Sequence, residues 1–243
     1  MTRRRWIADV VCGDRAALVG EHAAHLVRVL RAEVGQEFDI AAGDEVRVGT
    51  IVSVSEDRVE FALASEANHT VLLKSLPRIT LALAIFKFDR MEWAIEKCTE
   101  IGVARIVPVV ARRSDAHLVA AAAKRHERWQ RLVRQAAEQS RRSAPPEIGG
   151  PVKFKDLAEV VPMGARVVLA ESIAASDEVR VGEILKSRPT EVALAVGPEG
   201  GWADEELGWF LEAGWIAASL GRTILRAETA AIVSTALALE ALR

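Results

Sequence analysis

Two loops in the last third of the sequence carry the residue types that could hold a ligand and act on it. The first is the GPEGG run at 197–201, which follows an apolar stretch over 192–196. Glycines let a backbone approach a ligand closely, since they carry no side chain and accept dihedrals that other residues avoid. The second loop, at 220–230, places arginine, threonine and glutamate between two hydrophobic segments, where charged groups need partners. The first loop alone could be a plain turn between a strand and a helix, but the two loops together favour a binding site.

The elements that must position these loops alternate in type from residue 79 onward. Apolar runs predict strands over 81–86, 106–110, 166–170 and 192–196. Helical patterns lie between and after them, at 89–101, 121–140, 177–186 and 227–242. Strands that alternate with helices predict an α/β fold with a largely parallel sheet. Open sheets of this kind bind ligands at the carboxyl ends of their strands, where both loops would lie.

Two of these helices have a predicted cap or a predicted buried face. Asp89 and Glu92 have the spacing of a capping pair at the start of the helix over 89–101. The helix over 121–140 is basic, and its buried side is expected to carry Trp129, Leu132, Val133 and Ala136.

The stretch before residue 68 has a different pattern and predicts a small β-rich module. A short helix is expected over 21–32, with Leu26, Val29 and Leu30 on one face and Gly35 after its end. Two alternating runs, Val46 to Val54 and Val59 to Leu63, flank a polar turn and predict a hairpin with one buried face. A closed barrel would be an economical arrangement, because it removes exposed sheet edges. Residues 68–77 have the composition of a linker.

Composition limits the class of protein. The chain has 243 residues, of which 50% are hydrophobic and 27% charged, as in ordinary globular proteins. No apolar run reaches the roughly 18 residues that a membrane helix needs, and no signal peptide opens the chain. Cys12 and Cys98 lack metal-ligand spacing, so we expect no metal site and a cytoplasmic location. The net charge of −2 hides a stretch from Arg105 to Arg142 with ten lysines and arginines against three acidic residues, which could attract a polyanion.

The two loops together resemble the SPOUT superfamily of RNA methyltransferases, and within it the family that methylates N3 of a uridine in small-subunit (16S) ribosomal RNA. That family carries a GPEGG loop and an LG-x-R-I-L-R-x-E-T-A loop, which stand here at 197–201 and 220–230. The run over 25–31 is similar to the HL-x-x-VLR signature of the family's N-terminal module. The resemblance extends over nearly the whole chain, because further matches occur at Lys87, Arg90 and Lys97 and in the runs at 112–114 and 138–142.

The resemblance implies an α/β fold in which a C-terminal SPOUT α/β domain with a trefoil knot, at 73–243, follows a small PUA-like β-barrel RNA-binding domain, at 1–72. General topology rules argue against knots, so the residue pattern itself predicts none. The resemblance also implies S-adenosyl-L-methionine as the cofactor, and 16S ribosomal RNA or the assembled small ribosomal subunit as the partner. It further implies a homodimer joined through the knot. The final helix, at 227–242, is apolar around much of its circumference, which agrees with burial on more than one side.

The cofactor site is expected at three strand exits, because backbone-lined loops can surround an adenine and leave room at a methyl group. No G-x-G-x-x-G run follows a first strand, so the common dinucleotide-type fold is not indicated. The expected cofactor-binding residues are Ala170, Glu171, Gly197, Pro198, Glu199, Gly200, Gly201, Leu220, Gly221, Ile224 and Leu225.

Methylation of uracil N3 requires removal of its proton and stabilisation of the charge that spreads over O2 and O4. Arg226 has a planar guanidinium suited to holding two carbonyl oxygens, and we expect it to be catalytic. Glu228 and Glu199 are the candidate bases, with Glu228 assigned to catalysis. Structural roles remain open for both: Glu228 could pair with Arg226 or cap the following helix, and Glu199 could hold a loop or the cofactor ribose.

The resemblance and the local charge together predict arginines that contact RNA phosphates. For Arg28 and Arg31 a solvated helix face is the alternative, as it is for most arginines on surface helices. The predicted RNA-binding residues are Arg28, Arg31, Arg112, Arg113, Arg128, Arg131, Arg134 and Arg142.

Two positions depart from the family pattern. Ala203 stands where Ser or Thr is usual, which removes a helix cap opposite Glu206 at a cost of about 1 kcal/mol. The family's second loop carries an arginine at the position of Thr223, whereas this chain has its arginine one position earlier, at Arg222.

Two alternative functions are left open by the sequence: methylation of a ribose 2′-hydroxyl in another RNA, and RNA binding without catalysis.

Overall fold

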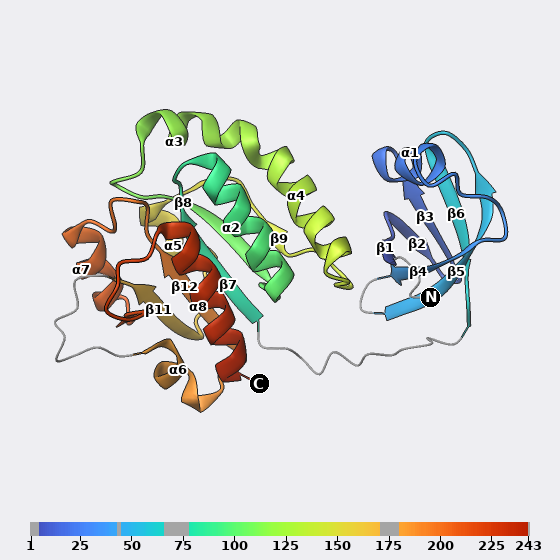
Figure 1. The fold of residues 1–243 in the computed structure, drawn as a ribbon. Helices are drawn as coiled ribbons and strands as arrows, with labels where there is room; N and C mark the ends of the chain where they lie inside the picture. Colours follow the sequence, from blue (N-terminus) through green and yellow to red (C-terminus); the bar gives the residue numbers. More distant parts are fainter. Residues whose placement is uncertain (1–4, 43–44, 66–77, 171–179, 243) are drawn as a thin grey trace. The chain divides into compact units, whose positions relative to one another are not determined.

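The computed structural model describes residues 5–42, 45–65, 78–170 and 180–242. Its contacts divide the chain into two compact units, and Figure 1 colours the chain along its length. The first unit is Met1–Ser75 with Ala137–Ala144, and the second is Leu76–Ala136 with Pro145–Arg243. The predicted linker at 68–77 lies outside the described residues.

The first unit is built on a six-stranded sheet. Its strands are β1 Arg5–Ile7, β2 Val10–Cys12, β3 Arg15–Val19, β4 Glu37–Ala42, β5 Glu45–Val54 and β6 Arg58–Leu63. They pair in the order β1-β4-β5-β6-β3-β2. Between β1 and β2, the amide of Ala8 donates to Ala41 O of β4, and the amide of Asp9 donates to Ala17 O of β3. The segment that joins the two end strands, β1 and β2, thus bonds to the strand next to each end, which closes the sheet on itself.

The predicted hairpin is present, but one of its strands turns the opposite face inward. β5 and β6 are antiparallel, and Val59, Phe61 and Leu63 of β6 are buried as expected. In β5 the fully buried side chain is Ile51, whereas Val52 is 38% exposed. The expectation that the alternating valines form the buried face of β5 is therefore wrong. A shift in strand register between residues 51 and 53 accompanies this change.

The predicted helix over 21–32 is shorter than expected. α1 spans Glu21–Arg28, and Leu26 is buried in the core of this unit. Val29 and Leu30 lie beyond the helix and are 63% and 37% exposed, so their assignment to its buried face is wrong. The chain then turns at Arg31, whose φ of 50° is a left-handed conformation that a continuing helix does not allow.

The second unit contains a seven-stranded sheet in which every pairing is parallel. Its strands are β7 Arg78–Ala84, β8 Arg105–Val110, β9 Glu147–Ile148, β10 Val152–Lys153, β11 Ala165–Leu169, β12 Glu191–Val196 and β13 Ile216–Ala218. The order is β10-β8-β7-β12-β11-β13, with β9 paired to β8. The four strands predicted from apolar runs are β7, β8, β11 and β12, so the expectation of an α/β fold with a parallel sheet is confirmed.

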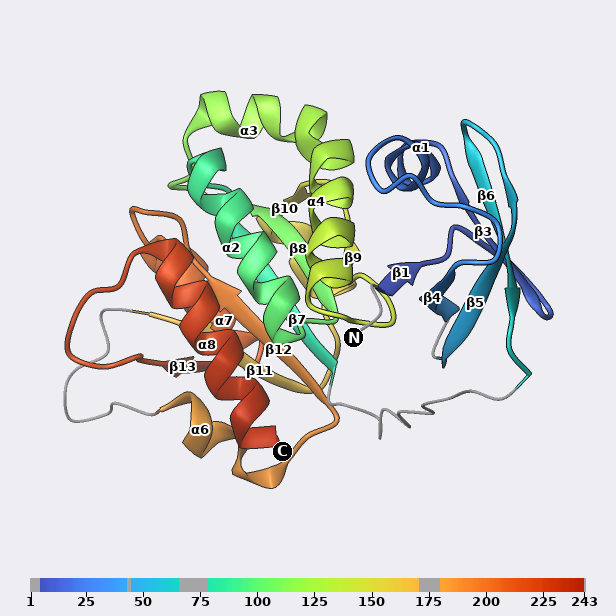
Figure 2. The same ribbon diagram turned by 45° about the vertical axis from the view of Figure 1, so that its right-hand side comes forward.

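Helices cover both faces of this sheet. They are α2 Phe88–Ile101, α3 Ala116–Ala122, α4 His126–Gln139, α5 Leu157–Val160, α6 Val181–Ile184, α7 Asp204–Glu212 and α8 Ala227–Leu242. The helices α2, α4, α6 and α8 share one core with alternate residues of β7 and β12. The opposite sheet face packs against α5 and α7, with Phe210 and Trp202 at its centre. Figure 2 shows α2 and α8 side by side on the first face.

Two helix predictions need correction. The basic helix predicted over 121–140 is divided into α3, a 3-10 turn at Ala123–Arg125, and α4. Its expected buried side is right, since Trp129, Val133 and Ala136 are buried. The capping pair expected at Asp89 is wrong: α2 begins at Phe88 with no side-chain cap, and Glu92 instead pairs with Arg125 and Arg128.

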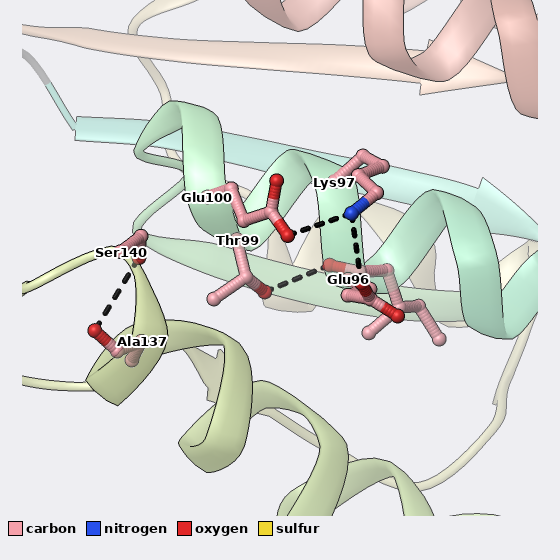
Figure 3. A network of polar contacts seen from close by, with 7 residues as sticks. Glu96, Lys97, Thr99, Glu100, Ala137 and Ser140 are labelled. Atoms are coloured by element: carbon pink, nitrogen blue, oxygen red, sulfur yellow. Dashed lines mark hydrogen bonds and ion pairs between the residues drawn. The ribbon is translucent and has the colours of Figure 1, made fainter.

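Polar contacts on α2 stabilise the helix itself. Lys97 Nζ lies 2.8 Å from a carboxylate oxygen of both Glu96 and Glu100, and these bonds raise the pKa of Lys97 (Figure 3). Thr99 Oγ1 donates to Ile95 O at 2.8 Å. Lys97 therefore makes these contacts within α2. It is one of the three basic residues, with Lys87 and Arg90, that contribute to the family resemblance.

Candidate functional site

A cavity of about 490 Å³ opens at the carboxyl ends of neighbouring strands in the second unit. Leu169 and Ala170 line it from the end of β11, residues 196–202 from the end of β12, and residues 218–227 from β13 to the start of α8. The three strand exits expected to hold the cofactor therefore surround one cavity. Every predicted cofactor residue that the structure describes lies on its wall, while Glu171 lies outside the described residues.

The glycine loop at 197–201 approaches its surroundings closely. A Cβ atom on Gly197 would lie 3.3 Å from both Nε1 and the backbone nitrogen of Trp202, which is tighter than ordinary contact. Gly201 has φ of 69°, a left-handed conformation that side chains disfavour, and its amide donates to Pro198 O at 2.8 Å. The glycines thus form a tight turn, and the whole turn lines the cavity.

The exit of β8 is bonded to this loop by residues from both sides. Arg113 Nη1 donates to Gly200 O and to Trp202 O, both at 3.0 Å. Glu206 of α7 accepts from the amide of Arg112 at 2.8 Å and from the amide of Ala203 at 2.9 Å. These four hydrogen bonds, which we call the β8-loop clamp, hold the turn at 197–203 against the end of β8.

The clamp also shows what the alanine at position 203 changes. Ala203 precedes α7 and provides no side-chain cap, as expected. The return half of the capping box is nevertheless present, because Glu206 accepts the Ala203 amide. The other oxygen of Glu206 accepts from the amide of Arg112. This carboxylate therefore stabilises the loop as well as the start of the helix.

Arg112 and Arg113, predicted together as RNA contacts, have different surroundings. Arg113 lines the cavity through its place in the clamp. Arg112 Nη1 lies 2.9 Å from Glu205 Oε1, and both side chains are largely exposed. A hydrogen bond from its own backbone, with Arg112 nearby, lowers the pKa of Glu205.

The second loop places its cations at the mouth of the cavity. Arg222, Thr223 and Ile224 line the cavity and are exposed, Ile224 by 78%. Arg226 also lines it, immediately before α8. Within the described ranges no ion pair joins Arg226 to Glu228 or to any other carboxylate, so its guanidinium is available to a ligand.

The two candidate bases differ in access to the cavity. Glu199 lies on the cavity wall, and its side chain is 39% exposed. Glu228 has a side chain only 6% exposed and is not among the residues that line the cavity. Arg90 of α2 contacts both carboxylates: its Nη1 lies 2.9 Å from Glu199 Oε1, and its Nε lies 3.8 Å from Glu228 Oε1.

Sequence reasoning did not assign Arg90 or Glu206 to the site. Arg90 was visible in the sequence only through its spacing from Lys87 and Lys97. Glu206 was named only as the residue opposite position 203, where Ala203 removes the usual helix cap. Both act across long stretches of chain, 109 residues for Arg90 to Glu199 and 94 for Glu206 to Arg112, which local patterns do not reveal.

The remaining predicted RNA-binding arginines are not among the residues that line the cavity. Arg28 pairs with Glu56 at 3.3 Å, and both side chains are well exposed. Arg128 pairs with Glu92 at 2.8 Å while 60% of its side chain stays exposed. Arg31 and Arg131 are exposed residues. Burial lowers the pKa of Arg142. Arg134 is half-buried.

Two further expectations concern absences. Among the residues whose positions are described, no group of three or more His, Cys, Asp and Glu side chains could hold a metal ion. Over the same residues, the helices include none with the length and apolar character needed to cross a membrane.

Comparisons with known proteins identify the relatives of this chain. A family model described as an RNA methyltransferase domain matches residues 74–239. The chain is 37% identical over 229 residues to a Mycobacterium bovis protein named ribosomal RNA small subunit methyltransferase E, which covers 91% of this chain and 85% of that one. It is 31% identical over 221 residues to a Bacillus subtilis protein of the same name, with 88% and 85% covered.

Solved structures show the same similarity. A ribosomal RNA small subunit methyltransferase E from Neisseria gonorrhoeae, bound to S-adenosylmethionine, has a TM-score of 0.77 and 26% identity, covering 97% of this chain and 96% of that one. A Legionella pneumophila protein in complex with the same cofactor has a TM-score of 0.81 and 31% identity, covering 99% and 98%.

Proposed function

The chain belongs to the RNA methyltransferase domain family, and on that premise we propose that it transfers a methyl group from S-adenosyl-L-methionine to N3 of a uridine in 16S ribosomal RNA. One observation carries this proposal: three strand exits meet at one glycine-rich cavity, and on its wall lies Arg226, which pairs with no carboxylate among the residues that the structure describes.

The cavity suits the cofactor in size and in chemistry. Its volume of about 490 Å³ lies in the range of small-molecule sites. Four of the lining residues are glycines, at positions 197, 200, 201 and 221, so part of the wall carries no side chain. The sulfonium of the cofactor is positive, and Glu199 places a carboxylate on the same wall. The predicted cofactor residues described above would hold it.

The bound cofactor would supply an electrophilic methyl group, and the chain must prepare the uridine to accept it. N3 becomes nucleophilic when its proton leaves, which places negative charge on O2 and O4. Arg226 can donate two hydrogen bonds to such oxygens from its planar guanidinium. Glu199 is the candidate base on the cavity wall, whereas Glu228 is buried and is not among the lining residues.

Three finer features belong to the same proposal. We assign residues 73–243 to a SPOUT domain with a C-terminal trefoil knot and residues 1–72 to a PUA-like RNA-binding domain. The closed six-stranded sheet of the first unit supports the second assignment. The substrate would be 16S ribosomal RNA or the assembled small subunit, in the cytoplasm.

We also propose a two-fold dimer. α8 buries one stripe of residues against the sheet, while Leu237 on its outer side is 45% exposed. Trp93 on the adjacent helix α2 is 49% exposed. Large apolar side chains exposed on neighbouring helices favour burial against a second copy. Light scattering at micromolar concentration should give twice the monomer mass of 26.4 kDa, and a monomeric mass would contradict the dimer.

Calorimetric titration of S-adenosylmethionine tests the cofactor site. Gly200→Val should weaken binding, because a Cβ at this position already lies 3.6 Å from Arg113 and the larger side chain would press on the clamp. Gly208→Ala is the matched control, since it lies in α7 with open space around its Cβ. Undiminished affinity in Gly200→Val would count against this loop as the cofactor site.

A further inference from the structure

Arg90 is placed where one side chain can act on both loops of the site. It lies in the first turn of α2, one residue before the buried Met91, and it lines the cavity. Its Nη1 reaches Glu199 in the glycine loop, and its Nε faces Glu228 in the first turn of α8. The guanidinium thus touches the loop after β12 and the helix that follows Arg226.

Glu228 is a buried carboxylate whose only ion pair among the described residues is with this arginine. Its side chain is 6% exposed, and Oε2 is buried without a hydrogen-bond partner among the described residues. Burial of an unpaired carboxylate is costly, so the charge needs a compensating group. The start of α8 contributes partial positive charge. Arg90 is the cation that the structure pairs with it, at 3.8 Å.

The two carboxylates contacted by Arg90 occupy different positions relative to the cavity. Glu199 and Arg90 lie on its wall, whereas Glu228 does not. A general base must come within hydrogen-bond reach of the proton that it removes, directly or through one water molecule. Glu228 is not among the residues that line the cavity, but it contacts Arg90, which is.

We propose that Arg90 is a positioning residue that fixes Glu199 on the cavity wall, and that Glu228 acts by orienting Arg90 rather than by removing the uridine proton. The part of this inference that concerns the reaction rests on the proposed function. Its consequences for stability and for cofactor binding do not. A planar guanidinium can present two edges to two carboxylates at once, which the single ammonium of a lysine does less well.

Removal of Arg90 should expose the dependence of Glu228 on its partner. Arg90→Ala leaves a buried carboxylate unpaired, and the melting temperature should fall by on the order of 5 °C or more. Glu228→Gln in the Arg90→Ala background removes that charge and should raise the melting temperature again. In the wild-type background the same Glu228→Gln change should lower it. Asp89→Asn, an exposed neighbour on α2, is the control and should change it little.

Arg90→Lys separates charge from geometry. Because the positive charge remains, its melting temperature should stay near that of the wild type. One of the two contacts is lost, so the affinity for S-adenosylmethionine should fall roughly tenfold, the equivalent of one charge-assisted hydrogen bond. Wild-type affinity in Arg90→Lys would contradict the assignment of both contacts to one guanidinium.

Single-turnover methylation distinguishes the two roles of Glu228. If Glu228 acts through Arg90, Glu228→Gln lowers the rate with an unchanged pH profile and lowers it no further in the Arg90→Ala background. If Glu228 were the base, the rate would recover as the pH rises, and the losses would multiply. That result, or a Glu228→Gln change that lowers the melting temperature equally in both backgrounds, would overturn the inference.

The melting and calorimetric measurements need no RNA. They would therefore still support the placement of Arg90 if the protein proved to methylate a different atom. Conversely, formation of N3-methyluridine without any thermal rescue would leave the proposed function intact and refute only this inference.

Discussion

The β8-loop clamp predicts that two adjacent arginines differ sharply in their effect on cofactor binding. Arg113 donates two hydrogen bonds of 3.0 Å to carbonyls of the loop at 197–203, whereas Arg112 points its guanidinium at the exposed Glu205. Replacing either one by alanine removes one positive charge from the same segment. Any difference between the two variants therefore reports the contacts of Arg113, because the loss of charge is common to both.

The size of the effect follows from these contacts. A hydrogen bond from a charged donor contributes roughly 1.5 kcal/mol, so two contribute about 3 kcal/mol. Because Arg113 is largely exposed, solvent screening reduces this to about half. The dissociation constant of S-adenosylmethionine should then rise about tenfold in Arg113→Ala. Arg112→Ala loses only an exposed ion pair outside the loop, and its constant should change by less than about threefold.

Calorimetric titration of both variants, with thermal melting as a check on folding, provides the assay. RNA affinity measured without cofactor should be equal in the two variants, since each loses one charge at the same place. Equal cofactor affinities would refute the clamp. A selective loss of RNA affinity in Arg113→Ala would restore the original expectation that Arg113 contacts phosphate.

Three further predictions concern the catalytic arginine, the buried thiol and the first unit. Arg226→Ala should lower the single-turnover rate by about a hundredfold with little change in cofactor affinity, and a wild-type rate would contradict its catalytic role. Burial raises the pKa of the Cys98 thiol from 9.0 to about 12. Between these values the unfolded chain has released a proton that the folded chain keeps, so the free energy of unfolding should fall as pH rises above 9. The free energy of unfolding, measured by denaturant titration at a series of pH values, should fall less steeply with pH in Cys98→Ala than in the wild type. Equal slopes against pH in the two proteins would argue against the thiol as the cause. Replacing Arg28 and Arg31 by alanine should weaken RNA binding and lower its salt dependence, while cofactor affinity stays unchanged; normal RNA binding would remove both residues from the interface.

The sequence was most informative where a strand is buried on both faces and ends in glycine. The apolar run over 192–196 became β12, and the loop after it lines the predicted cavity. The final helix has the predicted bounds, because its apolar run begins directly after a loop of charged residues. In these places the local pattern and the tertiary environment demand the same structure.

Local patterns failed where distant contacts decide the outcome. The valines of β5 alternate regularly, yet Ile51 faces the core because of how β5 pairs with β6. Glu92 matches a capping pair in sequence, but Arg125 of the 3-10 turn and Arg128 of α4 bind it instead. The roles of Arg90 and Arg113 likewise depend on partners far along the chain. Neither spacing nor composition distinguishes Arg113 from its neighbour Arg112.

The central claim is that the cavity at the strand ends serves to methylate N3 of a uridine in small-subunit ribosomal RNA. The direct measurement is to incubate the pure protein with S-adenosylmethionine carrying an isotopically heavy methyl group and with unmodified small ribosomal subunits or their RNA, and then to analyse the nucleosides by mass spectrometry. We expect heavy N3-methyluridine with the wild type, and about a hundredfold slower formation with Arg226→Ala. Label in a 2′-O-methyl nucleoside would assign the site to ribose methylation. Cofactor binding without label in any nucleoside, on either substrate, would contradict catalysis on this RNA.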